Sequence, residues 1–172
     1  MVHFLVDVSE SMDGLAGVEG TGSKLDIVKS MIVTHVCQRK LTSKTFEVAV
    51  TSFGDRNTSN HMQTEDGYDN INQIVKMDVP DQNFTQEILK MNYSGSGVAN
   101  NESTIAALMV TFDAMIKAKA NYKYNRVKVM VTDGESRIVE DEDDMQDVTS
   151  VVGSMNDPNP EGATKVEPIP LY

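Results

Sequence analysis

Short apolar runs alternate along this chain with longer segments in which apolar residues recur every three or four positions. The first run, Val2 to Val8, is apolar at most positions and turns polar where it ends, and Arg126 to Thr132 has the same character. A strand with one face in water would alternate apolar and polar residues, so such runs indicate strands buried on both faces, as in a parallel sheet. Because strands and helices alternate, we expect an α/β fold with a doubly wound, mainly parallel sheet flanked by helices.

The same patterns place the remaining elements. Further strands are predicted at Thr45 to Phe53, at Ile71 to Val79 and, as a proline-broken edge, at Thr164 to Leu171. Helices are predicted at Lys24 to Arg39, at Phe84 to Met91, at about Ser103 to Ala120, and from the acidic run Glu140 to Asp147 to near Gly153. No internal repeat or second domain is visible, so we expect residues 1–172 to form a single domain.

The helix predicted at Lys24 to Arg39 has the clearest apolar stripe. Ser23 is a suitable N-cap, and Asp26 lies in the first turn, where the helix dipole favours an anion. We expect the single cysteine, Cys37, to be a small core residue and not a nucleophile, and His35 to be half-buried and not a ligand. The stripe expected to face the core consists of Leu25, Val28, Ile32 and Val36, widened by Ile27 and Met31.

The acidic balance of the chain limits its partners. Its 172 residues carry a formal net charge of −11. Such a surface repels phosphate backbones, so we expect this domain alone to bind nucleic acid poorly and any DNA contact to need another, basic region. No stretch approaches the ~20 apolar residues that span a bilayer. Met1 to Val8 enters a strand without a basic region or a cleavage site, which leads us to expect an intracellular protein.

Two aspartates lie where ligands bind in such sheets, beyond the carboxyl ends of the strands. Asp7 opens an Asp-x-Ser-x-Ser segment after the first strand, and Asp133 follows the strand at Arg126 to Thr132. If these strands are neighbours, both carboxylates converge with the hydroxyls of Ser9 and Ser11. Hard oxygen ligands of this kind suit a divalent cation such as Mg²⁺. Without a metal, the carboxylates would instead accept hydrogen bonds from loop amides or from the N-terminus of the first helix.

Other cofactor and catalytic motifs fail on spacing. In Gly22-Ser23-Lys24-Leu25 no serine or threonine follows the lysine, as a phosphate-binding Walker A loop requires. Gly95-Ser96-Gly97 lacks the third glycine of a dinucleotide-binding loop and precedes the wrong element. No histidine has metal-ligand spacing, and no serine or cysteine has a visible base partner. We therefore do not expect an enzyme.

Together, the Asp-x-Ser-x-Ser segment and the later Thr132-Asp133-Gly134 resemble the metal-ion-dependent adhesion site of von Willebrand factor A domains. That family's site also takes a threonine from the loop before the helix that starts here at Ser103. Glu102 stands near that place and is an alternative ligand, while Thr104 is the threonine just beyond it. The resemblance thus implies either a cation site or a vestige without metal, made of Asp7, Ser9, Ser11, Thr104 and Asp133.

Three further stretches carry a narrower resemblance: Gly54 to Asn60, Gly67 to Ile71, and Tyr122 to Gly134. In this order they resemble the N-terminal domain of the large, eighty-kilodalton subunit of the Ku heterodimer, particularly its fungal forms. The match runs from Val2 to about Gly153, although Ser59 stands where the family usually has an acidic residue. The chain ends at Tyr172, earlier than the resemblance leads us to expect, so either the last strand and helix are absent or the chain is a trimmed piece.

The Ku resemblance implies a nuclear protein that acts in non-homologous end joining and telomere maintenance. It implies that this domain recruits repair or telomere and silencing proteins through peptide motifs. Its partner in the full-length protein would be the seventy-kilodalton Ku subunit, and double-stranded DNA ends would bind regions absent here. The family is sometimes labelled an ATP-dependent helicase subunit, but this chain has no Walker motif. We expect no membrane contact and no required cofactor, with Mg²⁺ as the one candidate.

Two other functions stay open. One is a metal-dependent adhesion-type domain, in which a partner's carboxylate completes the cation's coordination shell. The other is an intracellular scaffold domain, such as those of the proteasomal ubiquitin receptor or of the general transcription and repair complex. The segment Tyr68 to Ile71 favours the Ku resemblance over both.

Overall fold

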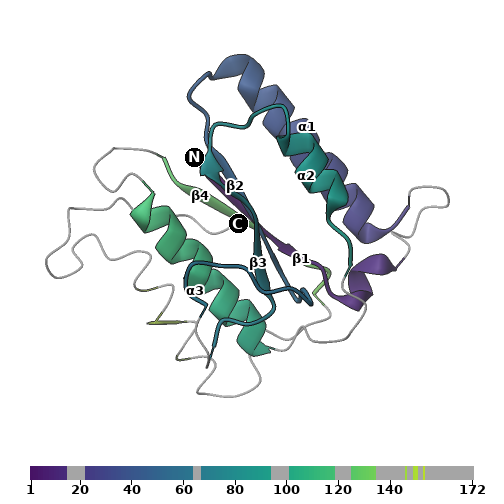
Figure 1. Ribbon diagram of the computed structural model, residues 1–172, viewed down its shortest axis with the longest axis vertical. Coiled ribbons are helices and arrows are strands. Elements are labelled where there is room, and N and C mark those ends of the chain that lie inside the picture. Colours follow the sequence, from purple (N-terminus) through teal and green to yellow (C-terminus); the bar gives the residue numbers. More distant parts are fainter. Residues whose placement is uncertain are drawn as a thin grey trace, which may run out of the picture.

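The computed structural model describes residues 1–14, 22–63, 67–93, 101–118 and 125–134, together with Gln146, Thr149, Ser150 and Gly153. Its strands are β1 (Val2–Asp7), β2 (Val48–Phe53), β3 (Ile71–Asp78) and β4 (Val127–Val131). Its helices are the 3₁₀ turn η1 (Glu10–Asp13), α1 (Lys24–Thr42), α2 (Phe84–Lys90) and α3 (Asn101–Lys117). These strands and helices follow the predicted order along the chain, with boundaries that differ by a few residues (Figure 1).

The four strands form one sheet in the order β3-β2-β1-β4. β1 lies in the middle and is parallel to both β2 and β4, which confirms the mainly parallel sheet. β3 is antiparallel to β2. The reason is the connection: a parallel neighbour needs a crossover, usually a helix, and none of the described residues between Phe53 and Ile71 is helical.

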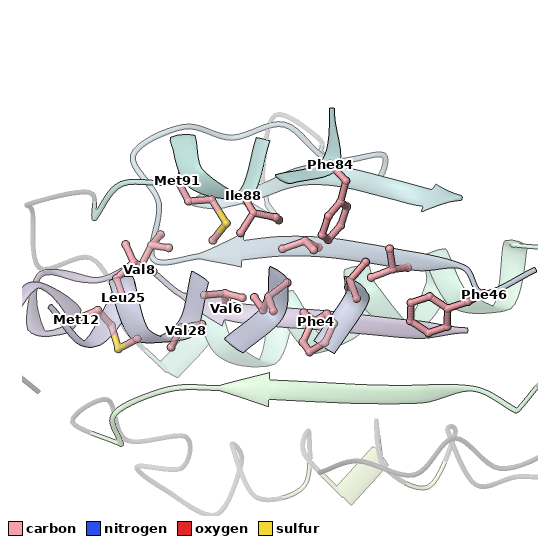
Figure 2. Packing of buried hydrophobic residues seen from close by; sticks show 14 residues of the cluster. Phe4, Val6, Val8, Met12, Leu25, Val28, Phe46, Phe84, Ile88 and Met91 are labelled. Atoms are coloured by element: carbon pink, nitrogen blue, oxygen red, sulfur yellow. The ribbon is translucent and has the colours of Figure 1, made fainter. Parts of the chain in front are cut away.

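Helices cover both faces of the sheet (Figure 1). Successive residues of β1 point to opposite faces, so Phe4, Val6 and Val8 face α1 and α2 while Leu5 faces α3. Figure 2 shows the first of these layers, where β1 packs against residues of α1 and α2. Its labelled members are Phe4, Val6, Val8, Met12, Leu25, Val28, Phe46, Phe84, Ile88 and Met91.

The start of α1 is as predicted. The Ser23 side chain accepts a hydrogen bond from the amide of Asp26 at 3.1 Å, and the Asp26 carboxylate accepts one from the amide of Ser23 at 3.2 Å. This reciprocal capping box satisfies two backbone donors that the first turn of a helix leaves without partners. The hydrogen bonds from Ser23 hold the pKa of Asp26 below its usual value.

The predicted width of the α1 stripe is wrong. Leu25, Val28, Ile32 and Val36 are buried, but Ile27 and Met31 are 44% and 42% exposed. Cys37 is exposed as well, so its assignment to the core is also wrong. Each of these three residues lies to one side of the buried line, and the described elements that α1 packs against are the sheet, α2 and η1. His35 is half-buried as predicted, edge-on to the rings of Phe4 and Phe46.

The C-terminal predictions fall mainly outside the described residues. Of the helix predicted from Glu140 to Gly153, the structure describes Gln146, Thr149, Ser150 and Gly153, and all four are helical. The edge strand predicted at Thr164 to Leu171 lies wholly outside the described residues. No helix in the part of the chain that the structure describes is long and apolar enough to cross a membrane.

Basic side chains are buried in the sheet face that α3 covers. His3 of β1 is wholly buried, and its Nε2 lies 2.9 Å from the Thr51 hydroxyl. Lys128 of β4 is also wholly buried, and its ammonium donates to the Leu108 carbonyl at 3.0 Å. Burial lowers the pKa of Lys128 to about 7. Burial, followed by repulsion from Lys128, lowers the pKa of His3 to about 3. His3 is therefore neutral at pH 7, whereas Lys128 loses its proton more than three pH units below the ordinary value for a lysine.

We predict that Lys128→Met changes how stability depends on pH. In the wild type, the unfolded lysine binds a proton up to its ordinary pKa of 10.5 while the folded one releases it near 7, so the free energy of unfolding rises with pH between these values. The methionine removes this rise and stabilises the protein at pH 7 by about 1–3 kcal/mol. Urea unfolding at pH 7 and at alkaline pH measures both effects.

The exposed Lys44→Met is the matched control and keeps the wild-type pH profile. If Lys128→Met lowered stability at pH 7 and left the pH slope unchanged, a pKa of Lys128 lowered by burial would be contradicted.

Candidate functional site

The two predicted aspartates lie together at the carboxyl ends of β1 and β4. Asp7 is the last residue of β1 and is fully buried, and Asp133 follows the end of β4 at Val131. β1 and β4 are hydrogen-bonded neighbours, with Val6 opposite Val131. The condition for the two carboxylates to converge is therefore met, at the end of the sheet where β1 finishes (Figure 1).

The Asp7 carboxylate is bound by the protein's own donors. Its Oδ1 accepts the amide N–H of Ser9 at 2.9 Å, and its Oδ2 accepts the hydroxyl of Thr132 at 2.9 Å. The Thr132 hydroxyl oxygen in turn accepts the amide of Gly134 at 3.2 Å. One buried carboxylate thus fixes the loop after β1 and ties it to the chain that leaves β4.

The Asp133 carboxylate has a different partner, the ammonium of Lys24. The Lys24 Nζ lies 2.8 Å from the Asp133 Oδ2, and the two side chains are 29% and 6% exposed. Lys24 is the first residue of α1, where the helix dipole disfavours a cation. Its backbone amide also donates to the Gly14 carbonyl at 3.0 Å. A carboxylate at this place offsets the unfavourable position of the lysine.

The three predicted hydroxyl ligands differ in their surroundings. Ser9 and Ser11 lie with their hydroxyl oxygens 3.1 Å apart, so each is within hydrogen-bond distance of the other. The Thr104 hydroxyl is buried and has no hydrogen-bond partner in the described structure. Thr104 belongs to the first turn of α3, which lies at the end of the sheet where β1 finishes (Figure 1). The side chains of Glu102 and Ser103 lie outside the described residues.

As it stands, this arrangement does not fit a divalent cation. Magnesium needs oxygen ligands that are free to coordinate it, in near-octahedral geometry at about 2.1 Å. Both Asp7 oxygens and one Asp133 oxygen are engaged by protein donors, and the Lys24 ammonium lies where a cation would contact Asp133. Within the described ranges, no three His, Cys, Asp or Glu side chains are grouped as a metal site. The Thr104 hydroxyl, which has no hydrogen-bond partner among the described residues, is what a free metal ligand would show.

Lys24 is the residue of this site that the sequence reading missed. By sequence, Lys24 is considered only as the lysine of a segment that does not match a phosphate-binding loop, and it is assigned no role at the strand ends. One signal was available, because a lysine at the first position of a helix opposes the helix dipole and needs a nearby anion. The identity of that anion was not available, since Asp133 lies 109 residues further along the chain.

The loop that carries the narrower resemblance is built around a second buried aspartate. The Asp55 carboxylate accepts the Ser52 hydroxyl at 2.9 Å and the Asn57 amide at 3.0 Å. Further on, Tyr68 and Asn70 have φ angles of 64° and 60°, in the left-handed region that costs a side chain energy. The Asn70 amide donates to the Thr58 hydroxyl at 2.9 Å, which helps to hold this turn. These contacts explain why polar residues are needed there.

Comparison with known proteins gives one family and one fold. The family model of the Ku70/Ku80 N-terminal alpha/beta domain matches residues 1–153. Among solved structures, the VWA domain of SpRpn10 is similar with a TM-score of 0.61 and 15% identity, over 90% of this chain and 68% of that one. A likeness at that identity shows the von Willebrand A fold alone. No curated protein matches.

We predict that Lys24→Met lowers the free energy of unfolding by about 1–3 kcal/mol, because it leaves the buried Asp133 carboxylate without its cation. The matched control is Lys90→Met, which removes an equally short ion pair, 2.7 Å from Glu87, in which both side chains are exposed. That control changes stability by less than about 0.5 kcal/mol. Urea denaturation of both variants is the measurement, and equal effects would contradict a structural role for Lys24.

A second prediction concerns metal. Adding millimolar Mg²⁺ or Mn²⁺ to the wild type should release no binding heat in isothermal titration and should shift the melting temperature by less than about 1 °C, because a ligand stabilises only a state that binds it. Saturable binding at these concentrations would show that the ion displaces Lys24, and would restore the cation site expected from the sequence.

Proposed function

The chain belongs to the Ku70/Ku80 N-terminal alpha/beta domain family, and on that premise we propose that it is the partner-recruiting domain of a Ku-type DNA-end-binding complex. The complex would act in non-homologous end joining and telomere maintenance. Ku-family proteins are generally nuclear, so we place this protein in the nucleus. The observation that carries the proposal is the extent of the family match, which covers residues 1–153 of 172.

The charge of the chain supports recruitment over DNA binding. A net charge of −11 repels the phosphate backbone, and nonspecific DNA affinity comes mainly from cations that neutralise phosphates. Contact with double-stranded ends is therefore assigned to other regions of a full-length protein, which would pair with the seventy-kilodalton Ku subunit. This domain would instead hold repair, telomere or silencing proteins through peptide motifs.

Catalysis has little support among the described residues. His61 and Asp113 form a close pair, with Nε2 and Oδ2 2.6 Å apart, of the kind that orients a general base. However, no serine hydroxyl or cysteine thiol is hydrogen-bonded to His61 in the described structure, and Asp113 also binds Lys117. A nucleophile and its base are therefore not brought together at this pair. We propose a binding domain without enzymatic activity.

Recognition of partners is also proposed to be independent of metal. In an adhesion-type domain, the partner's carboxylate completes the shell of a bound cation. Here the Lys24 ammonium already neutralises Asp133, and Asp7 is satisfied by Ser9 and Thr132. The alternative of a proteasomal scaffold draws only on the likeness to the SpRpn10 domain, which shows a fold that many functions share.

The proposal predicts a specific pattern of capture. The immobilised chain should retain repair or telomeric proteins from a nuclease-treated nuclear extract, equally well with Mg²⁺ or with EDTA. It should not bind fluorescent duplex DNA in polarisation assays at physiological salt, because its acidic surface repels the duplex. Recovery of no repair or telomeric protein would contradict the proposal. Loss of capture in EDTA would favour the adhesion-type alternative, and tight binding of duplex ends would favour a direct DNA contact.

A further inference from the structure

The outer edge of β3 is only partly paired. β3 is the edge strand of the sheet, and Ser59 lies beside its first residues as an isolated parallel bridge to Asn72. The Ser59 amide donates to the Ile71 carbonyl at 3.1 Å, and the Ser59 carbonyl accepts the Gln73 amide at 2.7 Å. Beyond Gln73, no described residue is hydrogen-bonded to the outer edge. Among the described residues, Ser59 thus adds one residue of a further strand, and none of them pairs with the rest of the edge.

A groove begins where the Ser59 bridge stops. It has a volume of about 550 Å³ and lies between this edge of the sheet and the second half of α3. β3 contributes Gln73, Lys76 and Met77 to its lining, α3 contributes Ala114 and Lys117, and Ala118 follows directly after α3. The two alanines are one helical turn apart and leave room for another chain beside the strand. An edge with unpaired backbone groups is a template for strand addition.

The charged residues that line this groove are all basic, in a chain whose net charge is −11. Lys76 is exposed and has no ion pair with any described residue. Lys117 and His61 both contact the Asp113 Oδ2, at 2.7 and 2.6 Å. Burial raises the pKa of Asp113, but the hydrogen bonds from Lys117 and His61 outweigh it and hold the pKa below its usual value. The Asp113 carboxylate is therefore already paired within the chain.

We propose that this groove, defined by the β3 edge, Lys76 and Lys117, binds an extended acidic segment of a partner protein. The segment continues the strand that Ser59 begins, with its backbone on β3 and its carboxylates beside the two lysines. The proposal rests on the recruiting function above and names the surface that performs it. A peptide fits better than a nucleic acid, because no Phe, Tyr or Trp is among the described residues that line the groove and the rest of the chain is acidic.

The test uses two labelled peptides with blocked ends, one alternating valine with glutamate and the other alternating valine with lysine. The first should bind the 172-residue chain and the second should not, and raising the salt concentration should weaken binding. Lys76→Glu should weaken the acidic peptide roughly tenfold or more, as loss of a charge contact and a new repulsion together imply. The exposed Lys44→Glu makes the same charge change away from the groove and should leave affinity within about twofold.

Hydrogen exchange distinguishes strand addition from charge attraction alone, because charge attraction does not protect backbone amides. With the acidic peptide bound, amides between Ile74 and Asp78 should exchange more slowly, because strand addition gives outward-facing N–H groups a partner. The proposal is overturned if the two peptides bind alike, if Lys76→Glu and Lys44→Glu have the same effect, or if β3 amides are unaffected. A thymidine oligonucleotide that displaces the peptide and protects the same amides would assign the groove to nucleic acid instead.

Failure of the groove proposal can be distinguished from failure of the proposed recruiting function. If Lys76→Glu captures the same repair or telomeric proteins as the wild type, the groove assignment is wrong and recruitment stands. If the wild type captures none of them, recruitment fails, and the peptide and exchange measurements still decide whether the groove binds an acidic strand. Thermal unfolding confirms that the variants are folded, since Lys76 and Lys44 are both exposed.

Discussion

The buried carboxylate of Asp7 is the constraint on which the rest of this structure depends. It stands at the end of the central strand with no exposure to solvent, so leaving it without donors would cost several kcal/mol. The Ser9 amide and the Thr132 hydroxyl supply the donors, and they come from the loop after β1 and from the chain after β4. Satisfying one charge therefore fixes where two segments far apart in sequence must meet.

Where those segments meet, the carboxylate of Asp133 lies at the same end of the sheet as Asp7, and its negative charge needs a cation. Asp133 obtains one from Lys24, at the start of the helix that follows the loop. In many α/β proteins a ligand binds beyond the carboxyl ends of the strands. Here the aspartates at that place are bound by ion pairing and hydrogen bonding within the chain. The groove beside β3 lies elsewhere on the sheet, and it combines basic side chains with strand backbone that has no hydrogen-bond partner among the described residues beyond Gln73. The carboxyl ends of β1 and β4 would then stabilise the fold, while the outer edge of β3 would bind a partner.

Local patterns in the sequence predicted the fold well. The unbroken apolar run of β1, the stripe from Leu25 to Val36 and the Ser23 cap depend on neighbours within a few residues, and all are confirmed. Ile27, Met31 and Cys37 were assigned wrongly because helical period fixes the direction of a stripe but not its width, which depends on what packs against the helix. The antiparallel β3 could have been inferred from the absence of a helix between it and β2.

The candidate site was predictable in part. The sequence correctly predicted that Asp7 and Asp133 lie at the same end of the sheet, because neighbouring parallel strands have their carboxyl ends on the same side. The partners of these aspartates were not predictable, since Lys24 meets Asp133 and Thr132 meets Asp7 across separations of 109 and 125 residues. The groove beside β3 had no local signal either, because it joins the Ser59 loop, a strand edge and a helix that are distant in sequence.

We propose that Lys24, and not a metal ion, is the cation at the strand ends. The most direct measurement is anomalous diffraction at the manganese edge from crystals grown with millimolar Mn²⁺. We expect no anomalous peak between Asp7 and Asp133, and density for the Lys24 ammonium in contact with the Asp133 carboxylate. A manganese peak bonded to Asp7 or Asp133, with Lys24 turned away, would contradict the account.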